Sequence, residues 1–244
     1  MEEGKLSEMC RRAAQRDILL FSRFLNLAEQ EQGKAAARAE GAACRFFGGM
    51  ENCERQVMGV GSDEAPETEA FPIVCIRIVQ RGAKFAKKPL AHRDVLGALL
   101  GLGIDREQLG DIVIRPEGAY VFCMRPLGAF ILSALLQVGS STVECSETEA
   151  PEGAVRQLAQ VRLQVASPRL DAVVAHLFKI SRGDAQELFH QGRVAVNDQA
   201  CLRPDYLLKE GQVVSVRGFG RGRYDGVEGV SKKGKSNLLF SLYQ

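Results

Sequence analysis

The sequence contains no long hydrophobic run. No span of the 244-residue chain approaches the roughly 20 apolar residues that a membrane helix requires. The apolar run from Ile18 to Phe21, near the N-terminus, is too short for the hydrophobic region of a signal peptide. We therefore expect a soluble, cytoplasmic protein with no membrane association.

The sequence also lacks any C-x-x-C pair. Its 7 cysteines are scattered at wide spacings. An odd and dispersed set of cysteines favours reduced thiols in a cytosol-like compartment over a disulfide framework or a zinc site. We expect no bound metal and no cofactor.

Catalytic motifs are missing as well. The H-R-D triplet at 92–94 copies the start of a kinase catalytic loop, but Leu99 stands where that loop needs an asparagine. The glycine-containing runs at Gly101 and Gly218 are not followed by the helix that a dinucleotide site requires. Serine, cysteine and histidine show no triad spacing, so we expect no catalytic residues.

Net charge is low, at +2, but its distribution is uneven. From Arg169 onward, 12 Lys and Arg face 8 Asp and Glu, a net charge of +4, whereas the preceding 168 residues carry 20 against 22, a net charge of −2. A local basic face suits phosphate binding, because each neutralised phosphate releases counterions.

This basic segment, 168–223, predicts two short helices followed by two strands. Apolar residues at i, i+3, i+4 and i+7 over 170–177 mark the buried stripe of a first helix. Ser181 and Asp184 have the spacing of a capping box and begin a second helix, which Gly192 ends. Alternating valines then predict strands at 194–196 and 214–216.

The same segment resembles the S4-type RNA-binding domain, a helix pair followed by a β-hairpin. The resemblance rests on R-L-D, I-S-R, A-Q-E-L, G-R-V-A-V-N and L-K-E-G-Q-V-V-S-V-R-G, in that order. Gly183 and Gln212 depart from the family pattern. RNA phosphates are bound mainly by arginine, with help from polar groups at helix starts and turns. The predicted RNA-binding residues are Arg169, Lys179, Ser181, Arg182, Gln186, Arg193, Asn197, Arg217, Arg221 and Arg223.

The central region alternates strands and helices in the order β-α-β-β-α-β, with 161–167 as the last strand. This is the split arrangement that RRM modules use. Tyr120 and Phe122 share one face of their strand, which fits base stacking or, alternatively, a packed sheet face. The RNP1 motif is absent. A basic run predicts either a second RNA contact or a solvated loop, with the candidates Arg81, Lys84, Lys87, Lys88, His92 and Arg93.

We therefore predict an α+β protein of three domains. Residues 1–66 form an α-rich N-terminal domain, with 5–40 largely helical, and an acidic, proline-containing linker follows at 62–70. Residues 70–166 form the RRM-like domain. Residues 167–244 form the S4-type domain with a basic, glycine-rich tail, whose apolar end is expected to form a strand that returns to the body.

The resemblance extends over nearly the full length. F-S-R-F-L, F-G-G-M-E-N-C-E-R, L-A-H-R-D-V-L-G-A-L-L-G-L-G-I-D-R-E-Q-L-G-D-I and S-V-R-G-F-G-R together are similar to the YlmH family of S4-domain proteins. The resemblance implies a non-catalytic factor that binds rRNA and tRNA on the large ribosomal subunit, in translation and the quality control of stalled ribosomes. We expect it to act as a monomer.

An RNA-modifying enzyme is the alternative. The triplet 169–171 resembles the R-L-D around the catalytic aspartate of pseudouridine synthases, which often carry an S4-type domain. Here the triplet opens the binding module, where Asp171 suits a helix start. A catalytic nucleophile or acid pair in the central region would favour the enzyme, and the sequence offers none.

Overall fold

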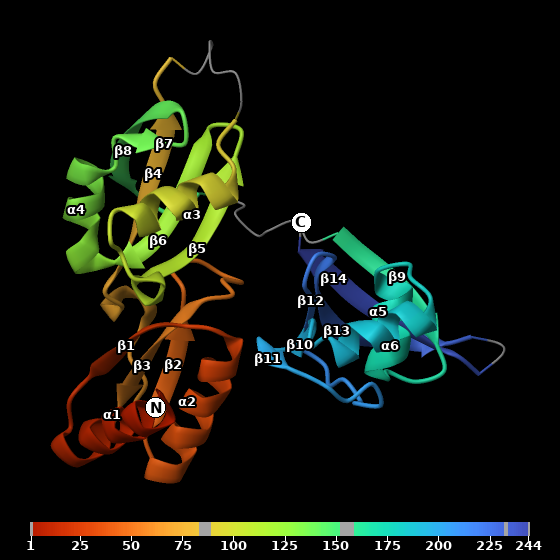
Figure 1. Cartoon of the computed structure of the whole chain (residues 1–244). Coiled ribbons are helices and arrows are strands. Elements are labelled where there is room, and N and C mark those ends of the chain that lie inside the picture. Colours follow the sequence, from red (N-terminus) through yellow and green to blue (C-terminus); the bar gives the residue numbers. More distant parts are fainter. Residues whose placement is uncertain (1, 83–88, 152–158, 232–233, 244) are drawn as a thin grey trace. The chain divides into compact units, whose positions relative to one another are not determined.

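The computed structural model describes residues 2–82, 89–151, 159–231 and 234–243. It divides into two compact units, Met1–Val155 and Arg156–Gln244, which are described separately. Both units combine helices with antiparallel sheets (Figure 1), as the predicted α+β class requires. No helix of the described residues is both long and apolar enough to cross a membrane.

The first unit begins with a three-stranded antiparallel sheet in the order β1-β3-β2. Two helices pack with this sheet around an apolar cluster that includes Cys10, Ala37 and Met58. The elements are α1 (Glu2–Arg16), β1 (Leu20–Leu25), α2 (Leu27–Glu40), β2 (Ala43–Phe47) and β3 (Gln56–Gly61).

The prediction of helix through 5–40 is wrong at 20–25, which is strand β1. Phe24 points into one apolar cluster and Leu25 into another, because successive side chains of a strand face opposite sides. The apolar residues of this strand lie at 20, 21, 24 and 25, with polar residues at 22 and 23, and this i, i+4 spacing is also that of a helix face. Helix α2 starts afresh at a capping box between Asn26 and Glu29.

The central part of the first unit is a five-stranded antiparallel sheet in the order β5-β6-β4-β8-β7. Helices α3 and α4 pack on one face around a large apolar cluster. The elements are η1 (Thr68–Ala70), β4 (Ile73–Gln80), α3 (His92–Gly101), η3 (Arg106–Gln108), β5 (Leu109–Arg115), β6 (Gly118–Met124), α4 (Arg125–Ala134), β7 (Gln137–Val138) and β8 (Ser141–Thr148).

The opposite face of the central sheet is covered by residues that precede it in sequence. Tyr120 and Phe122 are 7% and 1% exposed and pack with Phe24, Val57 and Phe71. The interpretation of this aromatic pair as part of a packed sheet face is therefore correct, and neither ring is accessible to a nucleobase.

Buried polar contacts accompany this packing. Asp111, 8% exposed, accepts hydrogen bonds from the backbone N–H groups of Glu54 (2.9 Å) and Arg55 (3.1 Å). The Arg55 guanidinium donates to the carbonyl oxygens of Phe24 (2.8 Å) and Leu109 (3.1 Å). Contacts thus cross the 62–70 connection, and a domain boundary there stays a prediction.

The second unit is a six-stranded antiparallel sheet in the order β11-β10-β12-β13-β14-β9, with two helices on one face (Figure 1). The core lies between helices and sheet and includes Leu170, Phe189 and Phe240. The elements are β9 (Ala159–Val165), α5 (Leu170–Leu177), α6 (Arg182–His190), β10 (Val194–Val196), β11 (Gln199–Ala200), β12 (Val213–Val216), β13 (Gly220–Val230) and β14 (Ser236–Tyr243).

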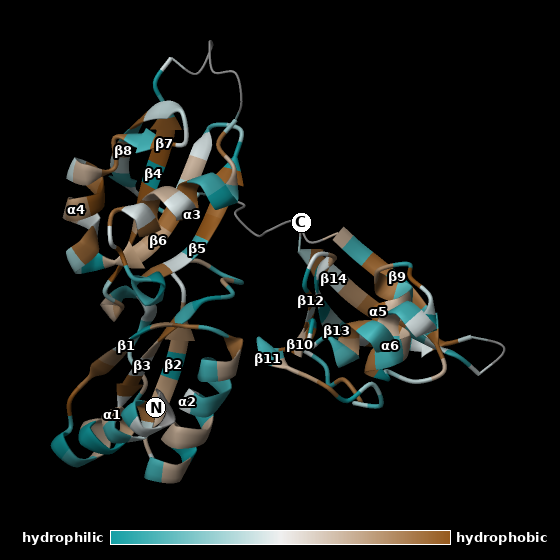
Figure 2. Cartoon of the chain, in the orientation of Figure 1, coloured by the Kyte–Doolittle hydropathy of each residue, from teal (hydrophilic) through white to brown (hydrophobic). Residues whose placement is uncertain are grey.

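Strand β9 corrects a second prediction. We expected 161–167 to close the central sheet, but β9 pairs with β14 along its length, from Val165 opposite Ser236 to Ala159 opposite Leu242. The central sheet ends instead with β8. The predicted return of the C-terminal segment is observed, since β14 pairs with both β13 and β9. In Figure 2, β4 is largely hydrophobic and α6 largely hydrophilic, in keeping with their burial.

Candidate nucleic-acid interface

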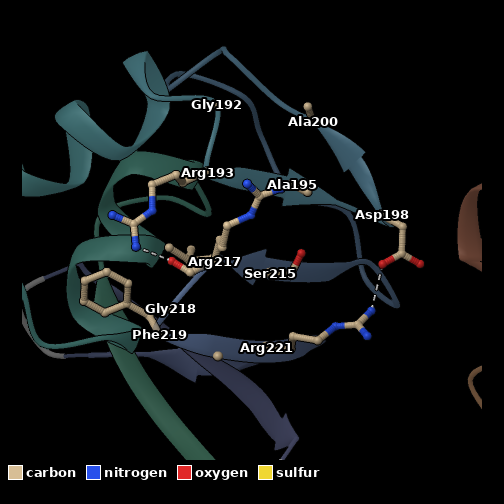
Figure 3. Close-up of a pocket in the computed structure, with 12 residues that line it drawn as sticks. Gly192, Arg193, Ala195, Asp198, Ala200, Ser215, Arg217, Gly218, Phe219 and Arg221 are labelled. Atoms are coloured by element: carbon tan, nitrogen blue, oxygen red, sulfur yellow. Dashed lines mark hydrogen bonds and ion pairs between the residues drawn. The ribbon is translucent and has the colours of Figure 1, made fainter. Parts of the chain in front are cut away.

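Three of the predicted arginines line one open pocket on the second unit. The pocket has a volume of about 560 Å³ and is formed by residues 192–193, 195, 198, 200 and 215–221. We call it the arginine pocket. Figure 3 shows Arg193, Arg217 and Arg221 around it, with Phe219 at one end and Asp198 at the other. Arg193 lies between α6 and β10, Arg217 directly follows β12, and Arg221 lies on β13.

Arg193 holds the turn that joins β12 to β13. Its carbonyl oxygen accepts a hydrogen bond from the Arg217 N–H (3.0 Å), and its guanidinium donates to the Arg217 carbonyl oxygen (2.5 Å). Gly218, with φ at +88°, leaves room for this contact, because a Cβ there would lie 2.7 Å from Nη2 of Arg193. One predicted RNA-binding residue therefore also fixes the geometry of the site.

The arginines differ in how far their charge is already neutralised. Arg221 pairs with Asp198 at 2.9 Å, and Arg223 pairs with Asp225 at 2.7 Å, just outside the pocket. Arg217 is exposed, and its side chain forms no ion pair with any residue that the structure describes. Arg193 likewise has no ion pair among the described residues, but its guanidinium donates to the Arg217 carbonyl oxygen and it is less exposed than Arg217. Arg217 is thus the most solvent-accessible unpaired cation of the pocket.

A second group of predicted residues gathers at the start of the helices. The Arg169 guanidinium donates two hydrogen bonds to Asp171, at 3.2 and 3.0 Å. Burial alone would raise the pKa of Asp171. The hydrogen bonds from Arg169 and from the Ala172 N–H, with the charges of Arg169 and Arg182, nevertheless hold that pKa below its usual value. Asp171 is therefore an ionised helix-start residue that pairs with Arg169 and also experiences the positive charge of Arg182.

Ser181 and Asn197 use their side chains to shape the backbone. The Ser181 hydroxyl accepts from the Asp184 N–H (3.0 Å), and the Asp184 carboxylate accepts from the Ser181 backbone N–H (3.3 Å), which completes the predicted capping box; the hydroxyl also donates to that carboxylate (2.7 Å). Asn197, with φ at +48°, accepts from the Val213 N–H (2.8 Å). Contact of either side chain with RNA stays a prediction.

The two remaining predicted residues of this unit, the cation Lys179 and the amide Gln186, are both exposed. Gln186 lies on α6, one turn after Arg182. Lys179 lies between the two helices with φ at +54°. It lines a neighbouring pocket of about 300 Å³ together with Phe219, Arg221 and Tyr243.

The secondary candidates that the structure describes follow β4 or begin α3. Arg81 pairs with Glu144 at 2.6 Å, and His92 begins α3. Arg93 is 82% exposed and lies 3.5 Å from Asp94. Lys84, Lys87 and Lys88 lie outside the described residues. A shared RNA-binding role for this run stays a prediction.

Two aromatic residues of the interface were not among the residues predicted from the sequence. Phe219 and Tyr243 each lie beside a guanidinium group: Cζ of Arg193 is 5.8 Å from the Phe219 ring centroid, and Cζ of Arg221 is 5.6 Å from that of Tyr243. The G-F-G run at 218–220 contained a signal for the first, since glycines on both sides of an aromatic residue indicate a turn that holds the ring outward.

The buried cysteines carry no sign of nucleophilic chemistry. Burial raises the pKa of both the Cys75 and the Cys123 thiol to about 12, so both stay protonated at neutral pH. Within the described ranges, no group of three or more His, Cys, Asp or Glu side chains is placed to hold a metal ion.

Both units of the chain are similar to parts of known proteins. A family model described as "Putative RNA-binding domain in YlmH" matches residues 66–152, and the S4 domain matches residues 168–214, which confirms the predicted S4-type domain. The chain is 30% identical over 220 residues to the ribosome-associated protein quality control protein P2 of Bacillus subtilis. That match spans 89% of this chain and 84% of the relative.

Two further matches are more limited. An uncharacterized RNA pseudouridine synthase of Aquifex aeolicus is 36% identical over 76 residues, which span 31% of this chain and 27% of that protein. A solved structure titled cell division protein ylmH, from Streptococcus pneumoniae, has a TM-score of 0.53 and 23% identity. It covers 60% of this chain and 88% of its own, and the likeness concerns the fold.

Proposed function

Because the chain belongs to the YlmH family of S4-domain proteins, we propose that it is a non-catalytic RNA-binding factor associated with the ribosome. The observation that carries the proposal is the match over most of both lengths to a relative named for ribosome-associated quality control. The arginine pocket supplies the physical basis, since cations held on a rigid scaffold suit the phosphates of folded RNA.

The interface has two parts. The arginine pocket presents Arg217 as a solvent-facing cation, with Arg193 fixing its backbone. The helix start presents Arg169 and Arg182 around Asp171. The sheet links the pocket residues and the helix pair orders the second group, so the spacing between cations is set before RNA binds. Such preorganisation reduces the entropy cost of association.

We further propose that the RNA is rRNA and tRNA on the large ribosomal subunit, and that the factor acts, as a monomer in the cytoplasm, on stalled ribosomes. The S4 domain supports binding to structured RNA, and the name of the Bacillus relative supports a role in ribosome-associated quality control.

We also propose an RRM-like architecture for the central sheet. Its strand order β5-β6-β4-β8 places β4 and β6 side by side in the middle, which supports the split β-α-β arrangement. The face that would stack bases in an RRM is filled by the packing around Phe122. Contacts with RNA would therefore come from the basic segment after β4 rather than from the sheet aromatics.

An RNA-modifying enzyme remains the second candidate function, and the partial match to a pseudouridine synthase is the observation that favours it. That match covers about a quarter of the synthase, as expected for two proteins that share a binding module. Incubation of the purified protein with rRNA and tRNA, followed by mass analysis of nucleosides, tests it: a new modified nucleoside would establish the enzyme.

The principal test is binding of the full chain to rRNA and tRNA as a function of salt. The Arg182→Ala, Arg217→Ala double variant removes one cation from each part and leaves the Arg193 contacts intact. We expect at least a 10-fold loss of affinity. The slope of log K against log salt should fall by about 2, since each phosphate contact contributes about 0.9.

The matched control is Arg162→Ala. Arg162 lies on β9 of the same sheet, is exposed and pairs with Glu228 at 2.5 Å, so its removal changes the net charge without touching the interface. Affinity and slope should stay at the wild-type values. Because Arg162→Ala removes one charge and the double variant removes two, the control is compared with the Arg182→Ala and Arg217→Ala single variants. Equal losses in all three would show that binding is bulk electrostatic attraction and would contradict the assignment of the site.

A further inference from the structure

One aromatic ring of the second unit is held in solvent at the edge of the arginine pocket. Phe219 is 45% exposed and lies in the turn between β12 and β13. Exposure alone is ordinary for a single apolar residue, but this ring lines two adjoining pockets, where a bound group could reach it.

The turn that carries the ring is fixed from several sides. The Phe219 N–H donates to the Val216 carbonyl oxygen (3.0 Å), and Arg193 binds the turn through Arg217. Gly218 and Gly220, on either side of the ring, have φ at +88° and +143°. These backbone angles are strained for other residues, so the two glycines fix the backbone on either side of the ring.

The surroundings of the ring are both aromatic and cationic. The Phe178 ring lies 6.0 Å from Phe219, tilted by 58°, and Figure 3 shows the Arg193 guanidinium beside it. Phe219 lines the arginine pocket and also the 300 Å³ pocket of Lys179 and Tyr243. Cations therefore flank the ring in both pockets.

We propose that Phe219 is a stacking platform for one unpaired nucleobase of the bound RNA, while Arg217 and Lys179 bind the phosphates on either side of that nucleotide. This inference rests on the proposed RNA-binding function and adds the class of target, a looped-out or single-stranded nucleotide rather than a continuous duplex. Every base has a π-face, so stacking tolerates sequence, and it strengthens binding by about 5- to 150-fold per base.

The positive charges of Arg217 and Lys179 favour a nucleobase over an apolar protein segment as the group that contacts Phe219. Neither Arg217 nor Lys179 forms an ion pair with the described residues, and an apolar segment would bury their charges without compensation. An unpaired nucleotide offers the ring a flat apolar face and offers the cations its own phosphates.

The test uses the full chain and two RNA hairpins that differ by a single looped-out 2-aminopurine nucleotide. We expect the wild-type protein to bind the bulged hairpin at least 5-fold more tightly and to quench 2-aminopurine fluorescence, which reports stacking. Phe219→Leu keeps an apolar side chain and should lose both effects while keeping its affinity for the fully paired hairpin. Phe219→Tyr keeps a ring and should retain both.

The possible failures are distinguishable. Absence of binding to either hairpin would overturn the RNA-binding function and the stacking proposal together. Equal binding to both hairpins, or a preference and quenching that survive in Phe219→Leu, would overturn the stacking proposal alone. Loss of ribosome association in Phe219→Leu with unchanged affinity for both hairpins would assign the ring to a protein partner and likewise overturn it.

Discussion

Gly218 is the residue at which the geometry of the interface can be tested most sharply. Its φ of +88° disfavours any residue with a Cβ, at a cost of about 1–2 kcal/mol. In addition, the Cβ of Gly218→Ala would lie 2.7 Å from Nη2 of Arg193. The guanidinium can move away, but it then loses its hydrogen bond to the Arg217 carbonyl oxygen.

Gly211→Ala separates these two effects. Gly211 lies in the same unit with φ at +83°, and a Cβ there would meet nothing within 4 Å. Both variants should therefore lose about 1–2 kcal/mol of stability from the backbone, measured by amide hydrogen exchange in β12 and β13. Only Gly218→Ala should also displace Arg217 and Phe219.

We expect Gly218→Ala to bind RNA about 10-fold more weakly, which corresponds to the loss of about 1.4 kcal/mol of binding free energy, and Gly211→Ala to bind as the wild type does. The assay is titration of a labelled rRNA fragment at fixed salt. Unchanged binding by Gly218→Ala, or equal weakening by both variants, would refute the role assigned to the turn.

Three further predictions concern stability. Asp111→Ala leaves two buried backbone N–H groups without an acceptor and should destabilise the first unit by about 2–4 kcal/mol, measured by urea unfolding, with a smaller loss for Asp111→Asn. Phe240→Ala removes a fully buried ring stacked on Tyr224 at 5.2 Å and should cost about 3–5 kcal/mol; a cost under 1 kcal/mol by hydrogen exchange in β14 would show that this strand is dispensable. Because the folded-state pKa of Asp171 is lowered, its stabilisation is complete above the unfolded value of about 3.9 and disappears as pH falls through the folded value. Asp171→Asn should therefore flatten the acid limb of the stability curve below pH about 4.

Local signals in the sequence were sufficient to predict most of the helices and strands of the second unit. The capping box at Ser181 fixes the start of α6, and the apolar stripe of α5 is buried as its periodicity predicts. The paired valines place β10 beside β12. Each of these features depends on residues within a few positions of one another, and the S4 resemblance adds the order in which they follow.

Features that depend on distant residues could not be predicted. The segment 161–167 reads as a strand, but its pairing with β14 depends on the other end of the chain. Strand β1 reads as a helix because its apolar residues at 20, 21, 24 and 25 repeat every four positions. The hydrogen bond that joins Glu54 to Asp111 spans 57 positions and leaves no local pattern. The candidate site follows the same rule: its arginines were predicted from local sequence, whereas the ion pair between Arg221 and Asp198 joins residues 23 positions apart and was not.

The most direct test of the central proposal is sedimentation of a cell extract with the protein followed across the gradient. The proposed function predicts that the wild-type protein travels with large ribosomal subunits and that the Arg182→Ala, Arg217→Ala variant moves to the soluble fraction, while Arg162→Ala stays with the subunits. A wild-type protein found only in the soluble fraction, at low salt and without loss of ribosomes, would contradict it.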